Sequence, residues 1–197
     1  MDLKKLQLYV IMEGLKRYDF LTQEECDTVV REILSLENAV KRLGPDEYEG
    51  TSEDSLTGRY KYFNYLNIHS INTIICPKLK KLFGPCLVQC WANIFRQGEG
   101  IDDHKHIYDE YYKRLGCLTS GNIFLYGDPN IGTYYEGIKH DNKVGELSIF
   151  PSNMLHGVPK NTTGDIRISM AIDIYTDDKV LLNDLVSEMP QRFFYIR

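Results

Sequence analysis

Residues 145–175 read GELSIFPSNMLHGVPKNTTGDIRISMAIDIY, and this stretch decides the fold. From Asp165 to Tyr175, apolar side chains alternate with side chains that are mostly polar. The two alternating sets are Ile166, Ile168, Met170 and Ile172, and Arg167, Ser169, Ala171 and Asp173. Because successive side chains of a strand point to opposite faces, the segment predicts a strand with one apolar face and one face that carries Arg167.

Similar strand-like segments surround this stretch. They are rich in Ile, Val, Phe and Tyr, and they span Cys86–Phe95, Leu118–Tyr126, Thr133–Ile138 and Gly145–Phe150. Turn-forming clusters separate several of them, at residues 127–130 and 161–164. Many short strands with turn signals between them predict a β-sandwich or a jelly roll over residues 86–176.

The N-terminal part of the chain has a helical pattern instead. Thr22 and Glu25 form a capping box, and apolar residues then recur at helical spacing until Leu43, with Gly44 ending the helix. A second helical region is predicted from Ser70 to Phe83, with Pro77 breaking it or beginning its second half. The expected fold is α+β and mainly β, with the helices of residues 1–85 packed on one sheet. One domain of 197 residues is expected to end in a tail at 177–197, helical at 180–185.

Composition narrows the classes of partner and compartment. The net charge of −5 and the pI of about 5.6 argue against a nucleic acid or an anionic membrane as the main partner. Residues 1–13 are too short and too polar a segment for a signal peptide or a membrane span. The cysteines are odd in number, five, and form no C-x-x-C pair, so we expect a reducing, cytoplasmic setting without disulfides.

Three of the five histidines stand in a pattern that fits a metal ion. His104 and His106 are two residues apart, which in an extended strand places both imidazoles on one face, and His156 follows the strand at 145–150. The next strand brings Arg167, whose guanidinium needs an anionic partner if it is buried. A protein carboxylate such as Glu146 or Asp173 would serve, and otherwise a bound dicarboxylic acid would.

At this point the sequence resembles a known superfamily. The elements that carry the resemblance lie between Trp91 and Tyr175, in one order: Trp91-Ala92-Asn93, Gly98 or Gly100, His104-x-His106, Ser120-Gly121, residues 145–152, His156, Asn161 and Arg167-Ile168-Ser169. They are similar to those of the 2-oxoglutarate/Fe(II)-dependent oxygenases. Within that superfamily the chain resembles a small, largely uncharacterised branch whose first metal motif reads H-x-H.

The resemblance implies a fold, a reaction and a set of site residues. The fold would be a double-stranded β-helix, and the chain would be a dioxygenase, a hydroxylase acting on a small molecule or a peptide. His104 and His156 would bind Fe(II), and O₂ would react there as 2-oxoglutarate is decarboxylated. Arg167 would hold the distal carboxylate of 2-oxoglutarate with Ser169 beside it. Tyr126 or Asn93, on neighbouring strands, would be a further contact for the cosubstrate.

One position departs from the superfamily's pattern. Its metal site normally combines two histidines with one carboxylate, whereas His106 stands where the carboxylate is expected. His106 can itself be the third ligand, which we favour because of its spacing from His104. Alternatively, the ligand is Asp102, Asp103 or Asp109. The ion can also be zinc, for which three histidines and a water molecule form a known catalytic arrangement.

Two other kinds of function fit the same residues. One is a cupin-like metal-dependent enzyme that does not use 2-oxoglutarate, and the other is a catalytically inactive, metal-binding β-sandwich module. The sequence predicts neither the substrate nor the oligomeric state. The segment at 107–115 interrupts the metal-binding region, either as a lid or as a plain packed insertion.

Overall fold

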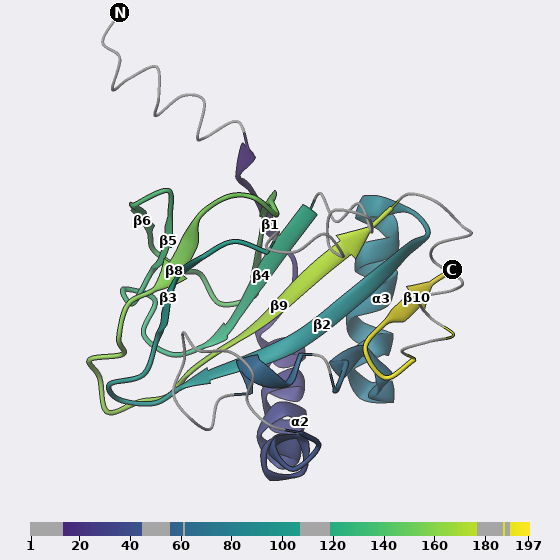
Figure 1. Cartoon of the computed structure of the whole chain (residues 1–197), viewed down its shortest axis with the longest axis horizontal. Helices are drawn as coiled ribbons and strands as arrows, with labels where there is room; N and C mark the ends of the chain where they lie inside the picture. The colour runs from purple at the N-terminus through teal and green to yellow at the C-terminus, as the bar shows by residue number, and fades with distance from the viewer. Residues whose placement is uncertain (1–13, 45–55, 61, 107–118, 177–186, 188–189) are drawn as a thin grey trace, which may run out of the picture.

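The computed structural model describes residues 14–44, 56–60, 62–106, 119–176, 187 and 190–197. In these residues two antiparallel sheets lie beside two long helices (Figure 1). The chain is therefore mainly β, as predicted. The expected helix at 180–185 and the insertion at 107–115 lie outside the described residues.

The larger sheet has six strands in the order β1-β7-β4-β9-β2-β10. Their bounds are Lys16–Asp19, Glu146–Pro151, Thr119–Tyr126, Arg167–Tyr175, Cys86–Phe95 and Phe194–Ile196. The alternation predicted for β9 is confirmed, because Ile168, Met170 and Ile172 all belong to the main hydrophobic core. Arg167 and its alternate neighbours therefore project from the opposite face of the sheet.

The smaller sheet has the order β3-β8-β5-β6, with bounds Ile101–His104, His156–Val158, Thr133–Tyr135 and Ile138–His140. The single strand predicted at 133–138 was wrong, since β5 and β6 form a hairpin. Both residues of its turn, Glu136 and Gly137, have positive φ angles, 49° and 77°. Such turns match the twist of paired strands, and the glycine after Glu136 was the signal for one.

The two helices cover one face of the six-stranded sheet. α2 spans Gln23–Lys41 and has the predicted capping box, although it ends with Arg42 as its cap, before Gly44. α3 spans His69–Phe83 and runs through Pro77 without a break, so the predicted interruption was wrong. An internal proline costs a helix roughly 3 kcal/mol. Burial of Ile71, Ile75 and Leu79 on one face of α3 offsets this cost.

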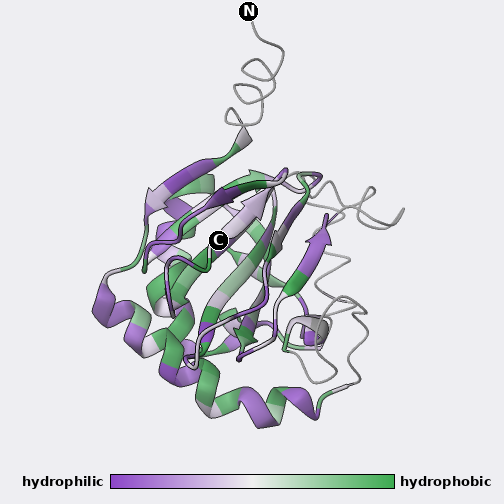
Figure 2. Cartoon of the chain, turned by 90° about the vertical axis from the view of Figure 1, so that its left-hand side faces the viewer, coloured by the Kyte–Doolittle hydropathy of each residue, from purple (hydrophilic) through white to green (hydrophobic). Residues whose placement is uncertain are grey.

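One hydrophobic core joins the helices to that sheet, as predicted. It includes Val29 and Ile33 of α2, Ile75 of α3 and Ile172 of β9, and the ribbons of both helices alternate between polar and apolar residues (Figure 2).

Short 3₁₀ turns at Thr57–Arg59 and Tyr65–Asn67 precede α3. Within the described part of the chain, no helix combines the length and hydrophobicity that crossing a membrane requires.

Gly145 ties the N-terminal segment to the start of β7, and its replacement tests this junction. Its carbonyl oxygen accepts hydrogen bonds from the backbone N–H groups of Phe20 and Leu21, at 3.0 and 2.8 Å. Its φ is +81°, and a Cβ would lie 2.1 Å from the carbonyl oxygen of Leu21. We expect Gly145→Ala to lower the free energy of unfolding by about 2–3 kcal/mol and the Tm by roughly 5–10 °C.

Gly164→Ala is the control for thermal denaturation. A Cβ at Gly164 would meet no heavy atom within 4 Å, and its φ is not in the left-handed region. Its Tm should stay close to that of the wild type. Equal Tm values for the two variants would contradict the role given to Gly145.

Candidate metal centre

Three histidines come together where the smaller sheet faces the larger one. His104 is the last residue of β3 and His156 the first of β8, and the two are direct partners across this strand pair. His106 follows two residues after His104. One nitrogen from each ring can be chosen so that all three lie within 4.8 Å of one another. We call His104, His106 and His156 the three-histidine group.

In each of these rings Nδ1 bonds to an oxygen that can only accept. Nδ1 of His104 donates to the carbonyl of Asp102 at 2.9 Å, and Nδ1 of His156 donates to the carbonyl of Met154 at 3.0 Å. Nδ1 of His106 donates to Oδ1 of Asp173 at 2.6 Å and also lies 3.0 Å from the Oγ of Ser120. In His104 and His156 the proton of the neutral ring is thus on Nδ1, and Nε2 keeps its lone pair. This is the tautomer that metal-binding histidines adopt when a second contact orients them.

Burial keeps the histidines of β3 and β8 neutral. Desolvation, followed by the electrostatic interaction with the neighbouring His106, lowers the pKa of His104 to about 4. The same causes, with His104 added, hold the pKa of His156 well below its usual range. A metal ion therefore displaces no proton from either ring at neutral pH, which removes one cost of binding.

The position of His106 differs from the simple strand geometry expected. β3 ends at His104, so His106 is not part of an extended pair. Its backbone N–H donates to the carbonyl of Ser152 at 2.9 Å, and its ring stacks on that of His104 with centroids 5.4 Å apart. Asp102 and Asp103 are exposed and stand outside the three-histidine group, and Asp109 lies outside the described residues.

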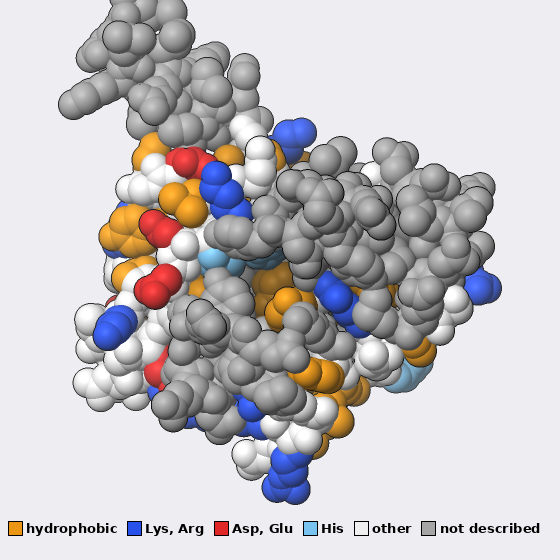
Figure 3. Space-filling view, viewed as in Figure 1, with side chains coloured by type: hydrophobic (Ala, Val, Ile, Leu, Met, Phe, Trp, Pro, Cys, Tyr) orange, Lys and Arg blue, Asp and Glu red, His pale blue; other side chains and the backbone are white. Residues whose placement is uncertain are grey.

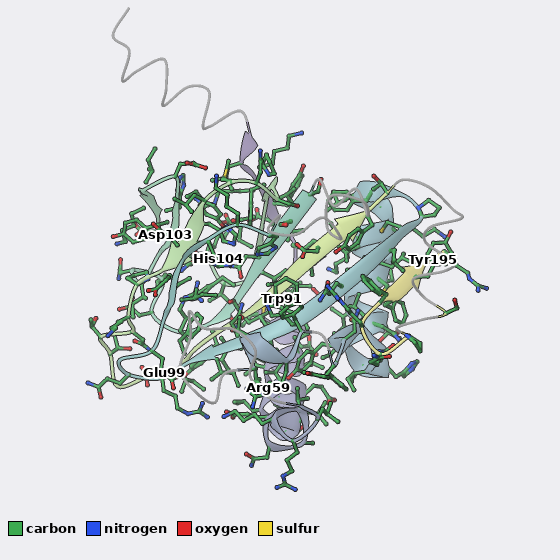
Figure 4. The ribbon with its side chains drawn as sticks, in the orientation of Figure 1. Arg59, Trp91, Glu99, Asp103, His104 and Tyr195 are labelled. Carbon is green, nitrogen blue, oxygen red and sulfur yellow. The ribbon has the colours of Figure 1, made fainter. Side chains whose placement is uncertain are left out.

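The three-histidine group lines a cavity of about 200 Å³. Figure 3 shows histidine side chains at the floor of a hollow, next to hydrophobic ones. The walls come from both sheets and include Asn93, Phe95, Thr133, Phe150, Ser169 and Asp173. The aromatic residues Tyr60 and Trp91 line another part of it, with ring centroids 5.8 Å apart. His104 and Trp91, on β3 and β2, are labelled in Figure 4.

Arg167 is buried beside this cavity, with 1% of its surface exposed. Its Nη1 and Nη2 donate to Ser169 Oγ and Thr133 Oγ1, both at 3.2 Å, and both partners line the cavity. Nε has no partner in the described residues. The rings of Phe95 and Phe124 lie 5.8 and 5.3 Å from the guanidinium carbon.

Neither carboxylate considered from the sequence neutralises Arg167. Glu146 pairs with Arg17, and Asp173 bonds to His106. Within the described residues no salt bridge to Arg167 is formed, and burial lowers its pKa from 12.5 to about 10. A buried cation with hydroxyl partners and no carboxylate is a suitable site for an anionic ligand.

The other two residues considered for the cosubstrate differ in their placement. Asn93 lines the cavity, and its Oδ1 accepts a hydrogen bond from Thr57 at 2.5 Å. Tyr126 is 45% exposed and does not line the cavity. A bulge between Phe124 and Tyr126 places Tyr126 opposite Ile168, which faces the helices.

Two functional candidates were not predicted from the sequence. Thr133 had no signal beyond its place in a strand-like segment. Asp173 had a partial signal, because the alternation in β9 puts it on the same face as Arg167 and Ser169. The sequence did not indicate that it bonds to His106.

No protein-family model and no curated protein sequence matches the chain. Solved structures do match it in fold. A viral collagen prolyl hydroxylase from Paramecium bursaria Chlorella virus-1, solved with 2OG, has a TM-score of 0.61 at 12% identity, covering 84% of this chain and 97% of that one. A Pseudomonas putida prolyl-4-hydroxylase has a TM-score of 0.54 at 16% identity, covering 84% and 94%. A nickel complex of the non-haem monooxygenase ThoJ has a TM-score of 0.56 at 20% identity, covering 83% and 74%.

Proposed function

We propose that this chain is a non-haem Fe(II)- and 2-oxoglutarate-dependent oxygenase, a hydroxylase, built as one domain on a double-stranded β-helix. The fold shared with prolyl hydroxylases and non-haem monooxygenases supports the proposal. The observation that carries it is the pairing of two features at one cavity. One is a three-histidine group in which every Nδ1 is hydrogen-bonded, and the other is a buried arginine that has no carboxylate partner among the described residues. Four unpaired cysteines in the described residues support a cytoplasmic location.

The residues present fit a metal ion of this kind. His104, His106 and His156 would hold it as three nitrogen ligands, which suit Fe(II) and leave its remaining positions open for other ligands. Bound iron would supply the activation of O₂ that is coupled to decarboxylation of 2-oxoglutarate. The chain's own contribution is to fix the three ring orientations through the Nδ1 contacts already described.

Arg167 fits one end of the cosubstrate. Its guanidinium can bind a carboxylate through two parallel hydrogen bonds, and the hydroxyl of Ser169 is placed to donate to the same group. The phenyl rings of Phe95 and Phe124 keep water from the guanidinium, which strengthens its attraction for an anion. Asn93 lines the same cavity. The substrate, a small molecule or a peptide, would enter from elsewhere on the cavity wall.

Turnover of 2-oxoglutarate tests the proposal directly. Purified protein with Fe(II), ascorbate and 2-oxoglutarate should form succinate without added substrate, slowly and in proportion to enzyme. Addition of N-oxalylglycine, a non-reactive mimic, should stop the reaction. Absence of succinate, together with a Tm that metal and 2-oxoglutarate leave unchanged, would refute the proposal.

A second candidate is favoured because the part of the chain that the structure describes places no carboxylate in the three-histidine group, and three histidines also form catalytic zinc sites. A cupin-like enzyme that does not use 2-oxoglutarate would then be the better assignment. Zinc at full occupancy in protein purified without added metal, and no binding of 2-oxoglutarate, would select it.

A further inference from the structure

Asp173 is a buried carboxylate directly attached to the three-histidine group. It lies on β9 with 3% of its surface exposed. Besides the bond from His106, its Oδ1 accepts one from Ser120 Oγ at 2.6 Å. The Ser120 hydroxyl has a single proton, which this bond uses, so the 2.8 Å contact with Ser152 requires Ser152 to donate to Ser120. The network leaves Asp173 as the final acceptor.

Iron sites of this class have an acidic ligand at the third position. In this chain the carboxylate of Asp173 is separated from that position by the imidazole ring of His106. The usual set is two histidines and one carboxylate. Here His106 occupies the third position and its far nitrogen is bonded to Asp173 at 2.6 Å. Among the described residues, the buried negative charge that touches the group is thus behind the ligand instead of on the metal.

We propose that His106 and Asp173 act as one unit that replaces the carboxylate ligand, with Asp173 as a positioning residue that aims Nε2 of His106 and supplies the site's negative charge through the ring. This inference rests on the proposed metal centre. It predicts that the pocket accepts one carboxylate, at 173 or at 106, but not both. Two carboxylates in the same buried space would repel each other and disfavour the folded, metal-ready arrangement.

A double-mutant cycle in metal affinity tests this unit. The four proteins are the wild type, Asp173→Asn, His106→Asp and the double variant, and the probe is Co(II) alone, titrated calorimetrically and followed by its visible absorption. Asp173→Asn should weaken Co(II) binding by about 10- to 100-fold, the usual effect of losing a partner behind a ligand. His106→Asp should also bind weakly. The double variant should bind Co(II) at least about tenfold more tightly than His106→Asp, since it carries one carboxylate again.

Asp103→Asn is the matched control for charge. Asp103 precedes His104 on β3 and is exposed, so its replacement removes the same charge without touching a histidine ring. Its Co(II) affinity should stay within about threefold of the wild type. In the metal-free proteins, the imidazole ¹⁵N signals of His106 should change in Asp173→Asn and not in Asp103→Asn, a readout that a loss of general stability would not produce.

The outcomes separate this inference from the proposed function. Wild-type Co(II) affinity in Asp173→Asn, or a double variant that binds no better than His106→Asp, would overturn it. Failure of the wild type to bind Co(II) would overturn it together with the metal centre. A positive coupling in a protein that forms no succinate would support the unit and refute the oxygenase.

Discussion

Alanine at His104 or at His156 is expected to abolish tight binding of divalent transition metals, with a loss of ~10³-fold or more in affinity. Both rings are neutral, and Nδ1 of each is already bonded to a backbone carbonyl, so Nε2 is aimed without further cost. Removing one of three ligands leaves a two-point site whose remaining positions water must fill. Calorimetric titration with Mn(II) or Co(II), with circular dichroism to verify folding, measures the effect.

His140→Ala is the control for this experiment. His140 lies on β6 of the same sheet, with its ring 5.6 Å from that of Tyr135, but it is not part of the three-histidine group. Its metal affinity should equal that of the wild type. A His156→Ala protein that still binds Co(II) within tenfold of the wild type would show that the three histidines do not form the metal centre.

The sequence predicted the long elements because their patterns depend on local rules. The predicted bounds of the strand Cys86–Phe95 agree with β2 at both ends. The capping box at Thr22 was equally local and is present. The strands β3 and β8 were not predicted. Strands of three or four residues, such as His156–Val158, are too short to show an alternation of polar and apolar residues, and they are defined by pairing across the sheet.

The site was partly predictable for a related reason. Residue type and spacing were enough to select His104 and His156, which line one cavity, and Arg167, which bonds to two residues of its wall. Contacts between distant segments cannot be deduced from residue type and spacing. The bond of Asp173 to His106 was therefore not predicted. Tyr126 does not line the cavity because one bulge reverses the face on which a side chain lies, and the residue types in Phe124–Tyr126 give no signal of a bulge.

The substitution Arg167→Met should separate function from stability. We expect it to weaken 2-oxoglutarate binding by about 2–5 kcal/mol, or ~30- to 4000-fold, because the anion would lose its buried, two-pronged partner. The Tm should nevertheless stay within about 3 °C of the wild type. At neutral pH the folded protein bears the desolvation cost of the buried cation, which lowers the pKa of Arg167 to about 10, and methionine removes that cost while filling similar space.

The measurements are calorimetric titration of the Mn(II)-loaded proteins with 2-oxoglutarate and thermal denaturation with and without it. In the wild type, ligand should raise the Tm because it binds only the folded state, and in Arg167→Met this rise should disappear. Mn(II) affinity should be unchanged, since the contacts of Arg167 among the described residues are with Ser169, Thr133 and two phenyl rings and not with a histidine. Arg96→Met is the matched control, because Arg96 pairs with Glu37 of α2 and does not line the cavity, and its side chain is 48% exposed. Undiminished 2-oxoglutarate binding in Arg167→Met would remove the reason for assigning this cosubstrate, because the assignment depends on the buried guanidinium that bonds to Ser169 and Thr133 of the cavity wall.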